Sequence, residues 1–288
     1  MSVEGVTKSF LPPAPFTKKM LLTTDHKFQE LDNISHMNKR AKHFSICVDN
    51  VFEDPDLIRK WALTLDYTSH PQGHWPGKRS TNFQDIEPEL NRQFIFKVLG
   101  LHGTNLWSRW EASLVTFHKI KRFSDNKDSI KNEGWVHTDE DDKNTIAGVV
   151  YLTPNIDIDS GTSLFNFKPD VPKEVEAKFW WNKQIEKKNF MVKGGEIDDI
   201  DKYEKALKEN NDMFFETTRF NNVYNRMLIY DGRQPHRANS FYHEGEERLS
   251  LIYFIHNLEV TDRDKKVVSP LSFIRSNDTF EKMVTILA

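Results

Sequence analysis

Residues 145–167 read TIAGVVYLTPNIDIDSGTSLFNF. Two short runs rich in Val, Ile, Leu, Phe and Tyr flank a turn-forming stretch, a pattern typical of two β-strands joined by a loop. Three further runs have the same character, and turn residues separate them: WEASLVTFHKI (110–120), NRMLIYDG (225–232) and RLSLIYFIHNL (248–258). Because no βαβ helices alternate with these strands, the pattern predicts an antiparallel barrel or sandwich rather than a parallel sheet.

The segment before these strands carries helical signals. FSICVDNVFE (44–53) indicates a strand that ends in a turn. DPDLIRKWALTL (54–65) begins with a capping Asp, has Pro in its first turn and repeats apolar residues at helical spacing. A loop over 69–85 and a second helix over 87–99, stopped by Gly100, should follow. The fold class is therefore mainly β with flanking helices (α+β).

Domain organisation can be read from the same patterns. Residues 168–222 interrupt the strands with KEVEAKFWWNKQIEKK and IDKYEKALKENND, which indicate polar helices. We expect this helical insertion to form a surface feature or a lid. Residues 1–43 are expected to be an extended N-terminal segment, 44–265 a single domain, and 266–288 a helical tail that packs on it.

Composition excludes some classes of function. The 288 residues are 38% hydrophobic and 29% charged, with a net charge of −3 and no long basic run, so binding to duplex nucleic acid is not expected. No apolar stretch approaches the about 20 residues of a membrane helix, and the N-terminus lacks a secretory signal. The single cysteine, Cys47, rules out an internal disulfide and fits a reducing compartment, so we expect a cytoplasmic protein. Cys47 lies in an apolar strand-like run and is expected in the core.

Three residues form a candidate metal site. His137 and Asp139 stand two apart in GWVHTDEDD, so in an extended chain both side chains point the same way. His236 follows a strand and the turn DGRQP. Two imidazoles and one carboxylate suit Fe(II), with Mn, Co or Zn as substitutes, and leave one face of the ion open. The alternative is that the acidic run 139–142 is a solvated loop.

Arg248 opens the strand RLSLIYF, twelve residues after His236. Arg248 and Ser250 alternate along this strand and so share a face. A buried guanidinium needs an anion, and a dicarboxylate co-substrate would supply one beside the Ser hydroxyl. The alternative is an exposed pair between Arg248 and Glu246 or Glu247.

Other residues have two interpretations. Arg79, in HWPGKRST, borders the site or is a solvated loop residue. His118, His243 and His256 are not spaced as additional ligands and are treated as structural.

Taken together, HTD, AGVVYLTP, a Gly-Thr turn before SLFNF, LIYDGRQPHR and RLSLIYF resemble the iron(II)/2-oxoglutarate-dependent oxygenases, over residues 110–257. The chain is most similar to the prolyl-hydroxylase-type and the phage- or bacterium-associated members. The resemblance implies a double-stranded β-helix, a jelly-roll or cupin-like barrel, with N-terminal helices.

The resemblance also implies roles. His137, Asp139 and His236 would be the catalytic metal ligands, and Arg248 with Ser250 would bind 2-oxoglutarate. The chemistry would convert 2-oxoglutarate and O₂ to succinate and CO₂ while hydroxylating a C–H bond, with ascorbate as a candidate reductant. Asp139 favours hydroxylation, because related halogenases have a small residue there.

Several points stay open in the sequence. A further 2-oxoglutarate contact on the strand 110–120 is Thr116 or His118. The primary substrate is a protein, a peptide or a small molecule, and a phage-encoded protein acting in a host cytoplasm would fit equally. The alternatives are a cupin-like metal-binding protein or isomerase without O₂ chemistry, and a non-catalytic β-barrel interaction module.

Overall fold

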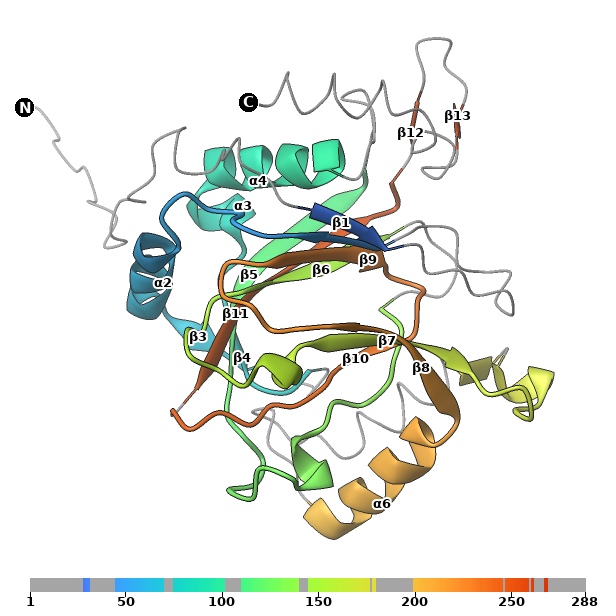
Figure 1. Cartoon of the computed structure of the whole chain (residues 1–288). Coiled ribbons are helices and arrows are strands. Elements are labelled where there is room, and N and C mark those ends of the chain that lie inside the picture. The colour runs from blue at the N-terminus through green and yellow to red at the C-terminus, as the bar shows by residue number, and fades with distance from the viewer. Residues whose placement is uncertain are drawn as a thin grey trace, which may run out of the picture.

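The computed structural model describes residues 28–31, 45–69, 75–101, 110–139, 145–176, 178–179, 199–245, 247–258, 260–261 and 267–268. Within this part, two antiparallel β-sheets face each other (Figure 1). The α-helices include α2 (Pro55–Thr64), α3 (Phe83–Ile86), α4 (Pro88–Leu101) and α6 (Ile200–Asn211), and residues 173–176 and 178–179 are also helical. The 3₁₀ turns are η1 (Ile130–Asn132) and η2 (Ile158–Ser160).

The large sheet has eight strands in the order β1-β2-β9-β6-β11-β5-β4-β3. They are β1 (Phe28–Leu31), β2 (Ser45–Val48), β3 (Tyr67–Thr68), β4 (Lys78–Ser80), β5 (Ala112–Ile120), β6 (Ile146–Tyr151), β9 (Met227–Asp231) and β11 (Arg248–His256). The small sheet has the order β10-β7-β8, with β7 (Thr162–Phe167), β8 (Phe214–Phe220) and β10 (His236–Ala238). Two short strands, β12 (Val260–Thr261) and β13 (Val267–Val268), pair with each other.

The two faces of the large sheet have different roles. Alternate residues of β11, such as Leu249, Leu251 and Tyr253, pack with α2, α3 and α4 in one hydrophobic core. The opposite face looks toward the small sheet, where Tyr151, Leu164 and their neighbours form a second core. Figure 1 shows α4 and the small sheet on opposite sides of the large sheet, and α6 on the same side as the small sheet. The residues of β11 that point away from the helices therefore lie between the sheets.

The expected fold class is confirmed, and so are the strands expected at 110–120, 145–153, 161–167, 225–232 and 248–258. The first helix begins where the sequence indicates, because the Asp54 carboxylate accepts a hydrogen bond from the Leu57 amide at 2.9 Å. Gly100 does not stop the second helix, since α4 continues to Leu101.

The structure differs from expectation in two stretches. The loop expected over 69–85 contains β4 and α3. The expected helical insertion contains α6, but FFETTRF forms β8, which pairs with β7. Only its first and last residues are buried, so the sequence lacks the alternation that marks a strand. The expected N-terminal segment contributes β1 to the large sheet, while most of it and most of the expected C-terminal tail lie outside the described residues.

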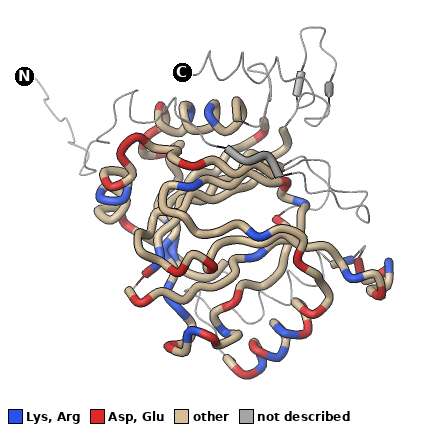
Figure 2. The backbone as a smooth tube through the Cα atoms, viewed as in Figure 1, with Lys and Arg blue, Asp and Glu red and all other residues tan. Residues whose placement is uncertain are grey.

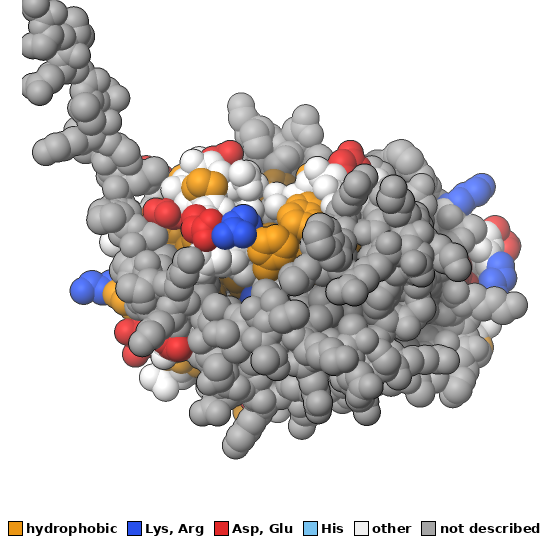
Figure 3. Space-filling model, turned by 90° about the horizontal axis from the view of Figure 1, so that it is seen from above, with side chains coloured by type: hydrophobic (Ala, Val, Ile, Leu, Met, Phe, Trp, Pro, Cys, Tyr) orange, Lys and Arg blue, Asp and Glu red, His pale blue; other side chains and the backbone are white. Residues whose placement is uncertain are grey.

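The charges are mixed over the described residues. Figure 2 shows acidic and basic side chains interspersed along the tube, on α6 for example. On the face that carries α4, the described side chains in view include hydrophobic groups next to acidic and basic ones (Figure 3). No described helix combines the length and the apolar character needed to cross a membrane.

Cys47 lies in β2 and is 5% exposed, in the core between the sheets. Burial raises the pKa of its thiol to about 11, against a smaller opposing effect of Arg226. The side chain is thus an inert part of the core, as the sequence indicates.

Candidate metal centre

A backbone bridge places His137 opposite His236. His137 belongs to the segment between β5 and β6, and His236 is the first residue of β10. The His137 amide donates to the His236 carbonyl at 3.0 Å, and the His236 amide donates to the His137 carbonyl at 2.9 Å. Because directly opposed residues of an antiparallel pair share a face, both imidazoles point the same way, with ring centroids 4.5 Å apart.

Hydrogen bonds to the backbone set the orientation of both rings. The Nδ1 atom of His137 lies 2.8 Å from the carbonyl oxygen of Trp135, and that of His236 lies 2.8 Å from the carbonyl oxygen of Gln234. A carbonyl oxygen can only accept, so each Nδ1 carries the proton and donates it. In a neutral ring with this tautomer, Nε2 is the atom that carries the lone pair, as a metal ligand requires.

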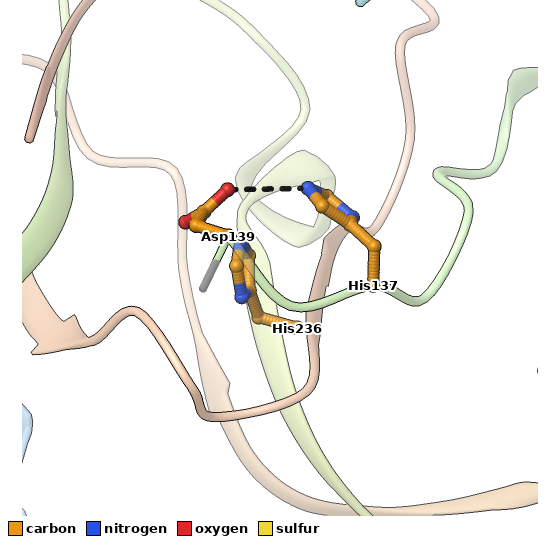
Figure 4. Close-up of side chains that lie close together, drawn as sticks. All are labelled: His137, Asp139 and His236. Carbon is orange, nitrogen blue, oxygen red and sulfur yellow. Dashed lines mark ion pairs between the residues drawn. The ribbon is translucent and has the colours of Figure 1, made fainter. Parts of the chain in front are cut away.

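Asp139 completes the group (Figure 4). Its amide donates to the Gly232 carbonyl at 2.7 Å, which fixes the chain two residues past His137. Its carboxylate oxygens lie 3.6 Å from His137 Nε2 and 3.3 Å from His236 Nε2. One ligand atom from each of the three residues can be chosen so that all lie within 4.8 Å of one another.

The donor set fits a divalent transition-metal ion. The Oδ2 atom of Asp139 is buried and finds no hydrogen-bond donor among the described residues. With both Nδ1 atoms turned to backbone carbonyls, two imidazole Nε2 atoms and a carboxylate face one another, an arrangement that a bound cation stabilises. Two imidazole nitrogens and one carboxylate oxygen suit Fe(II), Mn(II), Co(II) or Zn(II) and leave other coordination positions open.

The three residues line a cavity of about 160 Å³ between the two sheets. A cavity of that order admits a small organic molecule. Its wall includes aromatic and aliphatic side chains together with a few polar ones: Trp75, Arg79, His118, Ile120, Trp135, Tyr203, Tyr230, Phe241, Arg248, Ser250, Ile252 and Phe254. All five residues singled out as site residues in the sequence therefore lie around one cavity.

Arg248 is the most unusual charge in this wall. It is 5% exposed, and its guanidinium donates to the Ser240 carbonyl and lies 5.8 Å from the centroid of the Tyr151 ring. Among the described residues, no carboxylate, Glu247 included, acts on the charge of Arg248, and Glu246 lies outside the described residues. Burial lowers its pKa. The guanidinium is thus buried and turned toward the cavity, rather than exposed at a strand start.

His118 lies beside this arginine. It is opposite Ser250 in the β5–β11 register, and it lines the cavity, whereas Thr116 does not. Its Nε2 donates to the Pro76 carbonyl at 2.7 Å. Burial, followed by the charge of Arg79, lowers the pKa of His118 to about 3, so the ring is neutral at ordinary pH. The sequence left Thr116 and His118 open, and the structure places His118 at the cavity.

A glycine makes this contact possible. Gly77 has φ +76°, a conformation that side chains disfavour, and a Cβ there would stand 2.3 Å from the Lys119 carbonyl oxygen. The turn before β4 therefore approaches β5 closely enough to bring Pro76 to His118.

Several aromatic cavity residues had no role in the sequence reasoning, and Tyr230 and Tyr203 are two of them. The ring of Tyr230 lies 4.6 Å from that of His236, centroid to centroid. Tyr203 reaches the cavity from α6. Tyr230 stands next to Asp231 at the end of β9, just before the turn that leads to His236. This position is the sequence signal that could have indicated a place near the site. Nothing in the polar helix around Tyr203 marks it.

The fold and the site define a mainly β, jelly-roll protein with a candidate two-His, one-Asp metal centre between its sheets. The chain belongs to the Family of unknown function (DUF6445), which it matches over residues 32–240. No curated protein matches the sequence significantly.

Solved structures with a related fold include several enzymes. HygX from Streptomyces hygroscopicus, with nickel, 2-oxoglutarate and hygromycin B bound, is 10% identical, with 79% of this chain and 82% of HygX covered and a TM-score of 0.40. The non-heme alpha-ketoglutarate-dependent epimerase SnoN from nogalamycin biosynthesis is 11% identical, with 75% and 79% covered and a TM-score of 0.43. A Pseudomonas putida prolyl-4-hydroxylase is 14% identical, with 81% and 89% covered and a TM-score of 0.34. Similarity this low says nothing about what this chain binds.

Proposed function

We propose that this chain is a non-heme Fe(II)- and 2-oxoglutarate-dependent dioxygenase that hydroxylates a C–H bond. The observation that carries this proposal is the buried guanidinium of Arg248, which faces the same cavity as His137, Asp139 and His236. A buried charge without a counterion costs several kcal/mol, so the cavity is built for an anion near a metal. A small 2-oxo dicarboxylate supplies one carboxylate for the arginine and a chelating end for the ion.

The residues of the chain divide this work. His137, Asp139 and His236 would hold Fe(II), and Arg248 with the Ser250 hydroxyl would hold the distal carboxylate of 2-oxoglutarate. When bound, ferrous iron supplies the O₂ activation that turns 2-oxoglutarate, O₂ and a C–H substrate into succinate, CO₂ and an alcohol. Ile252 and Phe254, on the same face of β11 as Arg248, keep that side of the cavity apolar and exclude water.

Three features favour hydroxylation by a metal enzyme over the alternatives. Asp139 fills the position that a bound halide would need, which disfavours halogenation. A metal-binding cupin without O₂ chemistry has no need for a buried arginine in the cavity, and a non-catalytic module has no need for converging imidazoles. The substrate in this proposal is a peptide, a protein side chain or a small molecule, and the compartment is a reducing one such as the cytoplasm, where iron stays ferrous.

Direct binding and product formation test the proposal. Without O₂, the protein loaded with Ni(II) or Fe(II) should bind 2-oxoglutarate in calorimetry. Under air with Fe(II) and ascorbate, it should form succinate slowly even without a primary substrate. A protein that binds no divalent metal, or that binds metal but not 2-oxoglutarate, would contradict the proposal.

A further inference from the structure

A second guanidinium, which is partly buried, faces the cavity from another strand. Arg79 lies on β4, near the edge of the large sheet, and is directly opposite His118 of β5. His118 is in turn opposite Ser250 of β11. Directly opposed residues share a face of the sheet, so Arg79 points to the same side as Ser250, and both line the cavity.

The surroundings of Arg79 hold it in place without neutralising it. Its guanidinium lies 3.7 Å from the centroid of the Trp75 ring and 5.9 Å from that of Phe254. Its Nε is buried and has no acceptor among the described residues, and no described carboxylate forms an ion pair with it. Burial lowers the pKa of Arg79 to about 9, and the charge of Asp139 opposes this only in part.

Arg79 and Arg248 stand on strands that do not pair with each other. Neighbouring strands lie about 4.8 Å apart, so β4 and β11, with β5 between them, are about 10 Å apart. Both arginines depress the pKa of the intervening His118, whose neutral ring adds no charge. A 2-oxoglutarate held by Arg248 would leave the charge of Arg79, which Asp139 offsets only in part, open to a second anion.

We propose that Arg79 binds a carboxylate of the primary substrate, so that the substrate is a small organic acid with an apolar part. This inference rests on the proposed function, since it names the substrate class of the same site. Stacking on Trp75 leaves the edge of the guanidinium free, and its Nε and Nη groups then match the two oxygens of a planar carboxylate. Trp75 and Phe254 offer the apolar surface for the rest of the substrate.

N-acetylated hydrophobic amino acids are suitable probes, because they carry a carboxylate and no ammonium group that two arginines would repel. Each acid is compared with its carboxamide, and inorganic phosphate is the comparison anion. Binding to protein loaded with Ni(II) and 2-oxoglutarate is measured by calorimetry, and 2-oxoglutarate consumption is followed separately with Fe(II) under air. We expect at least one acid to bind about 10-fold or more tightly than its amide, since a charge-assisted hydrogen bond contributes that much.

Three variants isolate the arginine. Arg79→Gln should lose the preference for acid over amide and leave 2-oxoglutarate affinity within about two-fold of the wild type, which is a negligible free-energy change. Arg79→Lys keeps the charge but lacks the planar guanidinium that can donate two parallel hydrogen bonds to a carboxylate. This variant should retain part of the preference for acid over amide. Arg219→Gln is the matched control, because Arg219 is half-exposed on β8 and paired with Glu216 outside the cavity.

Several results would overturn the inference. If no acid binds better than its amide, Arg79 does not bind a carboxylate of this kind. If Arg79→Gln weakens 2-oxoglutarate as much as a change at Arg248 does, Arg79 belongs to the co-substrate site. If phosphate binds more tightly than every acid, and Arg79→Gln removes this binding, the substrate group that Arg79 binds is a phosphate rather than a carboxylate. If the wild type binds metal but no 2-oxoglutarate, the proposed function fails, while the acid and amide comparison on metal-loaded protein still tests Arg79.

Discussion

His137 and His236 are joined by two reciprocal backbone hydrogen bonds, of 3.0 and 2.9 Å, that hold their imidazoles side by side. Their ring nitrogens are oriented by two more backbone carbonyls, those of Trp135 and Gln234. Four contacts to the main chain thus orient the two candidate nitrogen ligands. A centre organised in this way is preformed before an ion arrives, which lowers the cost of binding.

Replacing His236 by alanine should abolish tight metal binding. The change removes one of three ligands, and since loss of an outer hydrogen-bond partner alone costs roughly 10–100-fold in affinity, loss of a ligand should cost at least about 100-fold. Calorimetric titration with Ni(II) measures the effect. His243→Ala is the control, because His243 is half-buried outside the cavity lining. If the two variants bind Ni(II) with equal affinity, His236 is not a metal ligand.

Metal should stabilise the folded protein. An ion that binds only the folded state at 100 times its Kd adds about 2.7 kcal/mol to the free energy of unfolding. For a chain of this size, that corresponds to a rise in Tm of roughly 5–10 °C, which a chelator should reverse. Thermal unfolding with and without Mn(II) measures it. Asp139→Ala should show no such rise, and a similar rise in that variant would point to binding elsewhere.

Arg248→Met should separate co-substrate binding from stability. The variant loses the charge-assisted hydrogen bonds to a carboxylate, so 2-oxoglutarate affinity should fall about 100-fold or more, with Ni(II) affinity unchanged. Because the guanidinium has no described counterion, an apolar side chain of similar length should leave the free energy of unfolding of the apoprotein the same or raise it by about 1 kcal/mol. Calorimetry measures the affinities for 2-oxoglutarate and Ni(II), and urea unfolding measures the stability of the apoprotein. A marked loss of stability would mean that Arg248 is a structural residue.

His118 should make stability depend on pH in the acid range. Its pKa is about 3 in the folded protein against an ordinary value of 6.5, so below pH 6.5 the unfolded chain binds a proton that the folded chain does not. The free energy of unfolding then falls as the pH falls, by about 1.4 kcal/mol per pH unit between these two values, and is unaffected above pH 7.

His118→Gln keeps a donor for the Pro76 carbonyl and removes this titration. Between pH 7.5 and pH 5 the wild type should lose about 2 kcal/mol more than the variant in urea unfolding. Parallel pH profiles for the two proteins would show that the ring is protonated or exposed in the folded state.

The sequence indicates which residues gather at the candidate metal centre because local rules decide much of their placement. His137 and Asp139 share a face by the two-residue repeat of an extended chain, and Arg248 shares one with Ser250 for the same reason. The strands that carry them are strongly apolar and bounded by turns, so their existence is also a local property.

The contributions of Arg79 and His118 depend on strand register instead. His118 reaches the cavity because β5 pairs with β11 in a register that sets it opposite Ser250, and Arg79 follows because β4 pairs with β5. Such pairings join residues 39 and 132 positions apart in the chain, and no periodicity within one strand encodes them. β8 escaped detection for another reason, since the middle of this edge strand is largely exposed and its residues do not alternate.

Because Cys47, the single cysteine of the chain, is buried, the protein is well suited to site-directed labelling at an introduced cysteine. A cysteine introduced at Lys205, whose side chain is 80% exposed on α6, would be the single accessible thiol of the described part. A nitroxide spin label attached there would allow the distance from α6 to a bound paramagnetic ion to be measured. The distance it reports would locate that ion within the molecule without any reference to turnover.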